Sequence, residues 1–258
     1  MMTRTPSFYR PTCWATAALL LALLQGCATA PGGNPADPFE SFNRSVFSFN
    51  DKVDMAVIKP VALAYRDVTP KPIRTGVTNF FGNVSDAWST VNNVLQAKPE
   101  FALDSLFRVT VNTLFGLGGI LDVAGEANIP KHTEDFGQTL GHWGVPAGPY
   151  LVLPVLGPST VRDTAALIVD TQGDAVSAAS NVAARNTLTA TRAVNIRARL
   201  LDAGNLLDEA SLDKYSFARE VHLQRRRSLV GRDPIEKEER FDLPETSAEP
   251  VKAPAASK

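Results

Sequence analysis

The chain has 258 residues, 44% of them hydrophobic, and a formal net charge of -1 at pH 7. Acidic and basic residues are equal in number between residues 27 and 232, so no electrostatic argument favours nucleic-acid binding. The excess of acids lies in residues 233–258, whose Glu, Pro and Ala content predicts a disordered acidic tail.

The N-terminal segment has the layout of a secretory signal. Arg4 and Arg10 precede an apolar run of about 11 residues that ends in small residues. As a helix this run would measure roughly 16 Å, too short to cross a hydrocarbon core of about 30 Å. The run closes on Leu24–Cys27, whose sequence LQGC resembles the lipobox of bacterial lipoproteins. We therefore expect residues 1–26 to be a signal peptide; ordinary secretion with a chance cysteine is the alternative.

Cys27 would become the N-terminus of the mature chain and carry covalent lipid. Each buried methylene contributes about 0.8 kcal/mol, so the three acyl chains of a lipoprotein would anchor it permanently. Ala28 follows the cysteine, where lipoproteins kept at the inner membrane usually have Asp, and this favours the outer membrane. Cys13 leaves with the signal, so the mature chain is expected to form no disulfide. Residues 27–36, rich in Pro and Gly, predict a flexible lipidated tether.

The residues after the tether predict a helix. Asp37, Pro38 and Glu40 occupy the N-cap, N1 and N3 positions of a capping box. An apolar stripe at spacings of three and four follows, made of Phe39, Phe42, Val46, Phe49 and Val53.

The remaining elements are mostly helical. Prolines at 60, 70 and 72 predict a break in the chain between the first helix and the next. Periodic patterns predict helices over about 72–81, 84–96, 99–114, 159–170, 182–203 and 213–230. Tyr150–Val155 is the one β-like run, and Pro154 interrupts it. The expected fold is all-α with irregular loops rich in Pro and Gly.

Two uncharged stretches test whether the chain spans a membrane. Val109–Leu121 would make a helix of roughly 20 Å, which is shorter than the hydrocarbon core. Trp143–Val161 is longer but contains four prolines and three glycines, so it cannot form a regular helix. Irregular backbone is not tolerated facing lipid, so this stretch should lie against protein or line a cavity. Residues 99–114 are apolar around most of the helix after Arg108, which predicts burial in protein or in lipid.

Several segments together resemble one family, the MlaA (VacJ) outer-membrane phospholipid-binding lipoproteins. The segments are Asp37–Asn50, Gly116–Gly125 and Thr133–Asp163, with a looser likeness at Asp213–Arg226. They occur in the family's order across the expected domain at residues 37–232.

The resemblance implies an all-helical ring or disc that lies in one leaflet of the outer membrane, monotopic, with an amphipathic channel through its centre. It further implies removal of phospholipids misplaced in the outer leaflet, transfer to a soluble periplasmic carrier, and association with trimeric porins. This function maintains the lipid asymmetry of the outer membrane. It requires no catalytic residue, cofactor or metal, because phospholipid is the transported ligand.

Five residues are candidates for the lipid channel: Phe42, Asn43, Gly116, Gly118 and Gly119. The alternative for the first pair is Phe in the core with Asn in solvent. The glycines favour close backbone approach or a flexible wall, because Leu121 stands where a GxGxxG phosphate loop needs its third glycine.

Aromatic rings favour the headgroup level of a membrane, so Trp143 and Tyr150 are candidates for the membrane interface, as is Trp88. Plain packing in the core is the alternative for Trp143.

Two further clusters have functional and ordinary interpretations. His132 lies beside Glu134 and Asp135, but the spacing matches no zinc pattern and no serine has a GxSxG context. A basic patch comprises Arg219, Arg225, Arg226, Arg227 and Arg232. It is explained by a solvated helix end, or alternatively by contact with lipid phosphates or an acidic partner.

Two other functional classes remain open at this point. A structural lipoprotein that tethers envelope layers is supported by the tail and its final Lys258, because some short lipoproteins join peptidoglycan through a terminal lysine. A phospholipase is the third class, although the expected chemistry is transfer and not bond breaking.

Overall fold

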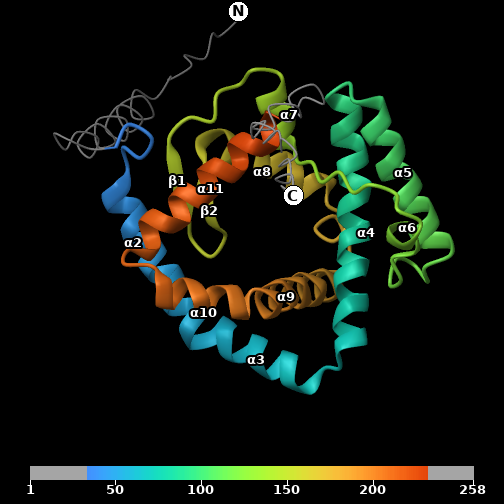
Figure 1. The fold of residues 1–258 in the computed structure, drawn as a ribbon, viewed down its shortest axis with the longest axis horizontal. Helices are drawn as coiled ribbons and strands as arrows, with labels where there is room; N and C mark the ends of the chain where they lie inside the picture. Colours follow the sequence, from blue (N-terminus) through green and yellow to red (C-terminus); the bar gives the residue numbers. More distant parts are fainter. Residues whose placement is uncertain (1–33, 232–258) are drawn as a thin grey trace, which may run out of the picture.

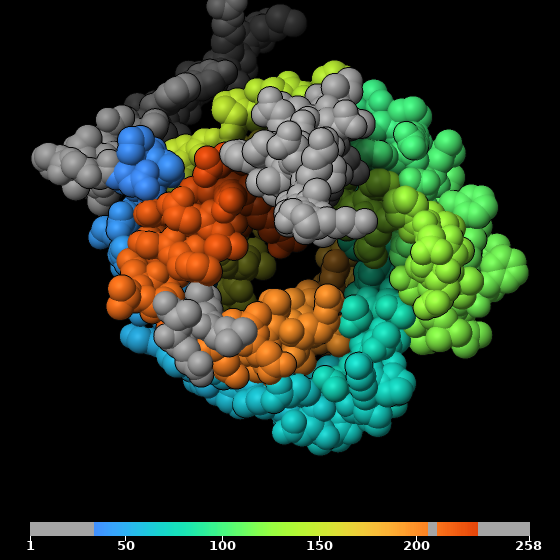
Figure 2. Space-filling model, viewed as in Figure 1, coloured from blue at the N-terminus to red at the C-terminus, as the bar shows by residue number. Residues whose placement is uncertain are grey.

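The computed structural model describes residues 34–231, with only the backbone of 206–210, and its elements form a ring (Figure 1). A central opening remains between the atoms in the space-filling view (Figure 2). The expected signal peptide, Cys27 and most of the tether, and the tail at 233–258 lie outside the described residues. In chain order the elements are α2 (Glu40–Val53), η1 (Asp54–Ile58), α3 (Lys59–Val68), α4 (Lys71–Leu95), α5 (Pro99–Leu114), α6 (Val123–Glu126), α7 (Phe136–His142), β1 (Tyr150–Leu153), β2 (Gly157–Thr160), α8 (Val161–Gly173), α9 (Val182–Arg199), α10 (Leu201–Ala210) and α11 (Lys214–Val230).

Most predicted helices are confirmed, but one predicted pair forms a single helix and one predicted helix forms two. The helix predicted over 99–114 is α5, and the one over 213–230 is α11. The helices predicted over 72–81 and 84–96 form the single helix α4, which packs along α5. Gly82 does not interrupt α4; the Lys131 ammonium lies 3.1 Å from where a Cβ would stand. The helix predicted over 182–203 divides at Leu200 into α9 and α10.

The prediction of a chain break at Pro60 was wrong. Helix α2 continues through the π-helical segment η1 into α3, and Pro60 occupies one of the first two positions of α3. The first turn of a helix tolerates proline because its N–H groups have no partner within the helix. Pro70 does mark a boundary, as the N-cap residue of α4.

The β-like run forms one arm of a small antiparallel hairpin. Strand β1 pairs with β2, with Tyr150 opposite Thr160 and Leu153 opposite Gly157. Pro154 ends the first strand, as the sequence predicts, and Val155 and Gly157 adopt positive φ angles of 66° and 85° in the turn. The second strand was not predicted, because its GPST sequence has no alternating apolar pattern.

Asp37 is not the N-cap of the first helix, contrary to the prediction. The N-cap position of α2 is Phe39, which makes no side-chain capping bond. Asp37 is instead buried, and its carboxylate accepts hydrogen bonds from Asn43 (2.8 Å), Arg219 (3.0 Å) and the hydroxyl of Tyr215. The start of the domain is thereby joined to the C-terminal helix α11.

The distribution of polarity in the described part of the chain is unusual. Buried polar and charged side chains outnumber buried apolar ones, and many large apolar side chains are exposed. The apolar core consists of small clusters, such as Ala62 with Ala198 and Leu201. Within residues 34–231, no helix combines the length and the apolarity needed to cross a membrane.

Candidate functional site

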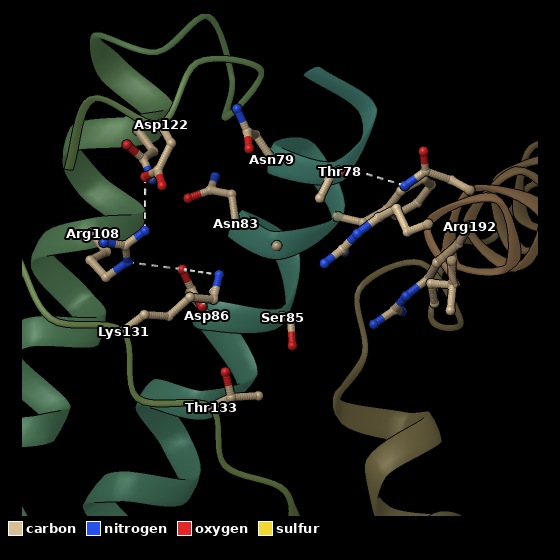
Figure 3. Close-up of a pocket in the computed structure, with 16 residues that line it drawn as sticks. Thr78, Asn79, Asn83, Ser85, Asp86, Arg108, Asp122, Lys131, Thr133 and Arg192 are labelled. Atoms are coloured by element: carbon tan, nitrogen blue, oxygen red, sulfur yellow. Dashed lines mark hydrogen bonds and ion pairs between the residues drawn. The ribbon is translucent and has the colours of Figure 1, made fainter. Parts of the chain in front are cut away.

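A polar cavity of about 380 Å³ lies beside the central opening, over helix α4 (Figure 3). We call it the α4 groove. Its lining comes from α4, from α5 and the segment 122–133 on one side, and from α9 on the other. A second cavity of about 340 Å³ shares Ser85, Thr133 and Arg192 with it and extends to α8. The two cavities adjoin along α4.

A buried ion-pair network forms the α5 side of the groove. Arg108 is 3% exposed and donates to Asp86 (3.3 Å), Asp122 (2.8 Å) and the carbonyl oxygen of Ile129 (2.6 Å). The Lys131 ammonium lies 3.0 Å from the other oxygen of Asp86. Charges taken out of water are costly unless paired in this way, so the network is a rigid wall and not a set of free charges.

Asp122 is held ionised within this wall. Burial alone would raise its pKa, but hydrogen bonds from Asn112 and from the Gly125 N–H, together with Arg108, lower the pKa below its ordinary value. The Asn112 amide donates to Asp122 at 3.0 Å, and its oxygen accepts from the N–H of Ala124 at 2.8 Å. The turn after α5 is therefore connected to the groove wall by charge-assisted bonds.

The α9 side of the groove carries two arginines. Arg192 is paired with Asp174 at 3.1 Å, and Arg199 is exposed and makes no ion pair with another described side chain. Asn195 donates to the hydroxyl of Thr78 at 2.9 Å and so holds α9 against α4 (Figure 3). This side thus offers cationic groups that the fold does not fully neutralise.

The predicted glycine cluster stands behind the groove wall. Gly119 has φ +94°, and a Cβ there would meet the side chain of Asn83 at 2.7 Å. A Cβ on Gly116 would lie 2.4 Å or less from two backbone oxygens. The N–H groups of Gly118 and Gly119 bond to carbonyl oxygens at the end of α5 (3.1 and 2.8 Å), so neither is open to a phosphate. Gly119 supports Asn83, which lines the groove, and none of the three glycines lines it.

For the first helix, the structure contradicts the alternative of Phe42 in the core and Asn43 in solvent. Phe42 is 54% exposed, whereas Asn43 is fully buried and does not line the opening. The Asn43 amide donates to Asp37 (2.8 Å) and to the carbonyl oxygen of Tyr150 (3.1 Å), and its oxygen accepts from the N–H of Val152 (2.9 Å). Asn43 therefore joins α2 to the hairpin, and Phe42 belongs to the outer surface.

The two aromatic interface candidates differ in exposure. Trp143 is 64% exposed, with its indole N–H donating to the carbonyl oxygen of Leu95 at 2.9 Å. Tyr150 has no exposed surface and packs between α2 and α11, so it cannot meet a headgroup layer. Burial, with the nearby charge of Asp37, raises the pKa of Tyr150 to about 12. Trp88 is half-buried and donates to Asp170 at 2.7 Å.

The histidine and arginine clusters are tied into the fold. His132 stacks on Phe101 at 4.0 Å and lies 3.0 Å from Asp104. No group of potential metal ligands occurs among the described side chains. Two of the C-terminal arginines form internal ion pairs: Arg219 with Asp37, and Arg226 with Asp135 and Asp163. Arg225 and Arg227 remain exposed on α11, and Arg232 lies outside the described residues.

Helices on the outer circumference of the ring carry many exposed apolar side chains. Helices α2, α3 and α5 occupy this circumference (Figure 1). Their exposed large side chains, with those of the turn after α5, are Phe42, Phe49, Val61, Val68, Leu103, Leu106, Phe107, Leu114, Phe115, Leu117 and Leu121. We call this surface the apolar belt. It far exceeds the scattered apolar residues of an ordinary protein surface, and such patches mark contact with a membrane or a protein.

Comparison with known proteins identifies this architecture. The family model described as MlaA lipoprotein matches residues 35–229. The chain belongs to the MlaA lipoprotein family. The "Intermembrane phospholipid transport system lipoprotein MlaA" of Escherichia coli (strain K12) is 40% identical over 215 residues, covering 81% of this chain and 84% of that protein. The protein of the same name from Haemophilus influenzae is 35% identical over 162 residues, 60% of this chain and 65% of its own length.

A solved structure supports the same assignment. It is described as "Structural basis for maintenance of bacterial outer membrane lipid asymmetry" and superposes with a TM-score of 0.67 at 38% sequence identity. The match covers 75% of this chain and 98% of the other. The mostly helical fold expected from the MlaA resemblance is therefore confirmed.

The main residues of the α4 groove were not predicted. Arg108, Asn83 and Arg192 were passed over because each looks like an ordinary polar residue of a surface helix. A signal was present in the first half of the domain: polar residues recur on α4 at spacings of four and three, at Asn79, Asn83, Asp86, Thr90 and Asn93. A polar stripe of this kind, on a helix that carries apolar residues elsewhere on its circumference, predicts that the stripe lines a polar cavity or a second interface.

Proposed function

We propose that this chain is an outer-membrane lipoprotein that removes misplaced phospholipids from the outer leaflet and passes them to a soluble periplasmic carrier. The observation that carries the proposal is the inverted polarity of the ring, with the apolar belt outside and the polar α4 groove beside the opening. Its relatives bear the name of an intermembrane phospholipid transport system. Cys27 carries the lipid anchor, and residues 1–26 direct the export of the chain.

The polarity pattern suits a lipid on its way out of a bilayer. A phosphate headgroup that enters hydrocarbon loses its hydration, and burying an unpaired charge costs several kcal/mol or more. A polar path bounded by an apolar exterior gives the headgroup charged and hydrogen-bonding partners while the surrounding lipid contacts the belt. The shortest axis of the molecule runs through the ring (Figure 1), so the ring can lie flat in one leaflet, whose hydrocarbon layer is about 15 Å thick.

The proposal includes two protein partners, both drawn from the family. Trimeric porins would hold the ring in the plane of the membrane, and the soluble carrier would accept lipid on the periplasmic side. No bond is broken during transfer, so no cofactor, metal or catalytic residue is required. Release of fatty acid from phospholipid by the purified protein would contradict this part of the proposal.

Deletion of the gene tests the proposal directly. We expect excess phospholipid in the outer leaflet and increased sensitivity to detergent, both restored by the wild-type chain. The variant Cys27→Ser should be exported but should not restore either property, because it lacks the anchor. Normal surface lipid composition in a clean deletion strain would refute the transfer function.

Removal of residues 233–258 separates transfer from a tethering role. Lipid transfer should survive in the truncated chain, because the tail lies outside the segment that matches the MlaA family. If the envelope instead detaches from the peptidoglycan layer while surface lipid stays normal, the structural-lipoprotein alternative is correct.

A further inference from the structure

The side-chain oxygen of Asn83, in the α4 groove, lacks the hydrogen-bond partner that burial normally demands. Asn83 is 8% exposed and lines the groove (Figure 3). Its amide nitrogen donates to the hydroxyl of Thr113 at 3.0 Å, but its side-chain oxygen is buried with no hydrogen-bond donor. Leaving an acceptor unsatisfied costs about 1–3 kcal/mol, so natural proteins rarely retain one without a ligand or a function.

The position of Asn83 is fixed by its surroundings. Gly119 packs directly against it, where any larger residue would collide with its side chain. Thr113 on α5 holds the amide nitrogen, which sets which of the two side-chain atoms remains available. The fold therefore holds an acceptor without a donor at a set place in the groove wall.

The opposite side of the groove presents cations. Arg199 is exposed and makes no ion pair with another described side chain. Arg192 pairs with Asp174 at 3.1 Å, and the same carboxylate also accepts a hydrogen bond from Ser177. Arg192 also lies over the ring of Phe81 at 5.9 Å, which orients its guanidinium at the junction of the two polar cavities. Arginine is suited to phosphate because its planar donors match two phosphate oxygens at once.

We propose that the α4 groove is a headgroup subsite for a phosphodiester, with the phosphate bound by Arg192 and Arg199 and a donor group of the headgroup bound by the Asn83 oxygen. The donor is an ammonium or hydroxyl group, as in phosphatidylethanolamine or phosphatidylglycerol. The volume of about 380 Å³ lies within the usual range for small-ligand sites, about 300–1,000 Å³. The half-exposed Ile196 at the rim provides an apolar exit for the rest of the lipid.

This subsite rests on the proposed transfer function and specifies where the headgroup is held. The test uses the full lipidated chain purified in mild detergent. Co-purified phospholipid is quantified by mass spectrometry, and affinity is measured with a short-chain phosphatidylethanolamine. We expect Arg199→Gln to weaken short-chain lipid binding about 10-fold, since a charge-assisted hydrogen bond is lost at an exposed residue that the fold does not need. Arg225→Gln, which removes an exposed cation on α11, is the matched control and should bind like wild type.

Variants at Asn83 test the acceptor. Asn83→Asp keeps the shape and the acceptor and adds negative charge, so the bound ratio of phosphatidylethanolamine to phosphatidylglycerol should rise. Asn83→Leu should lower the binding of both lipids. If Arg199→Gln binds as wild type does while Arg225→Gln loses lipid, the phosphate lies on α11 and the subsite is wrong. Inorganic phosphate that binds as tightly as the short-chain lipid would also overturn a headgroup site.

The two proposals fail in different ways. A wild-type chain that carries no phospholipid and binds no short-chain lipid would contradict the transfer function itself. A wild-type chain that binds lipid with an affinity unchanged by the Arg199 and Asn83 variants would contradict only the subsite. Circular dichroism of each variant in the same detergent shows whether the helical ring has folded, so loss of binding is not confused with loss of structure.

Discussion

Asn43 on the first helix satisfies the backbone of the strand that begins at Tyr150, more than a hundred residues away. Its amide donates to the Tyr150 carbonyl oxygen at 3.1 Å, and its oxygen accepts from the N–H of Val152 at 2.9 Å. Two turns along the helix, the amide of Asn50 donates to the carbonyl oxygen of Leu153 (2.9 Å), and its oxygen accepts from the N–H of Val155 (2.7 Å) at the turn of the hairpin. Residues seven apart share a helix face, so α2 turns an amide-bearing face inward. The apolar residues beside that face, such as Phe42 and Phe49, remain exposed on the surface.

Asn43→Leu should destabilise the ring strongly. The change leaves two buried backbone groups without partners and removes one of the hydrogen bonds to Asp37, each costing about 1–3 kcal/mol, so we expect a loss of at least about 3 kcal/mol of unfolding free energy. The measurement is urea unfolding in detergent, followed by far-ultraviolet circular dichroism. Ser45→Ala, at an exposed position on the same helix, should change stability by less than about 0.5 kcal/mol. Equal effects from the two variants would show that the Asn43 bonds contribute nothing.

Gly119→Ala should be worse tolerated than Gly118→Ala. Both glycines have positive φ angles, which cost a non-glycine residue roughly 1–3 kcal/mol. Only Gly119 also faces a close neighbour, the Asn83 side chain at 2.7 Å, whereas nothing lies within 4 Å of a Cβ on Gly118. Thermal unfolding of the two variants should therefore rank Gly119→Ala lower, and it should also reduce lipid binding in the groove. The reverse order would contradict the packing described here.

The unfolding free energy should fall as the pH drops below neutrality, in part because of His222. Burial, with repulsion from Arg226, lowers the pKa of His222. The unfolded chain takes up its proton near pH 6.5, before the folded chain does. The contribution of His222 is therefore complete above about pH 6.5 and is lost as the pH falls through the folded pKa. Urea midpoints at about pH 7.5 and about pH 5.5 should differ less in His222→Gln than in wild type. Gln224→Ala, beside it on α11, should keep the wild-type difference.

Phe107→Ser should leave folding intact and weaken membrane association. Phe107 is exposed on the outer face of α5, so its removal costs the folded ring no internal packing. Burying one such side chain in lipid contributes about 1.5–3 kcal/mol, which corresponds to a change of about 10-fold or more in partitioning. Vesicle flotation of the chain lacking its acyl groups measures this effect, with Thr110→Ser as the matched control on the same helix. A lowered melting temperature without a change in flotation would place Phe107 in a protein contact instead.

The sequence predicted the elements far better than it predicted their inward faces. Helix α5 was found at its observed boundaries because proline begins it and the glycine-rich turn follows it. The single helix α4 was divided at Gly82, because local propensity does not register the support that α5 and Lys131 provide. The groove is built from four separate segments of the chain, so no local pattern could reveal it.

The sequence alone determined the helical class, the apolar helices and the segments that carry the MlaA likeness, because each of these is written in local periodicity and in short motifs. The tertiary structure decided which side of each helix turns inward. It placed Phe42 outside and Asn43 inside, and it brought Asn83 and Arg192 to one groove. The physical reason is that a periodic stripe marks an apolar face without stating whether protein or lipid will cover it.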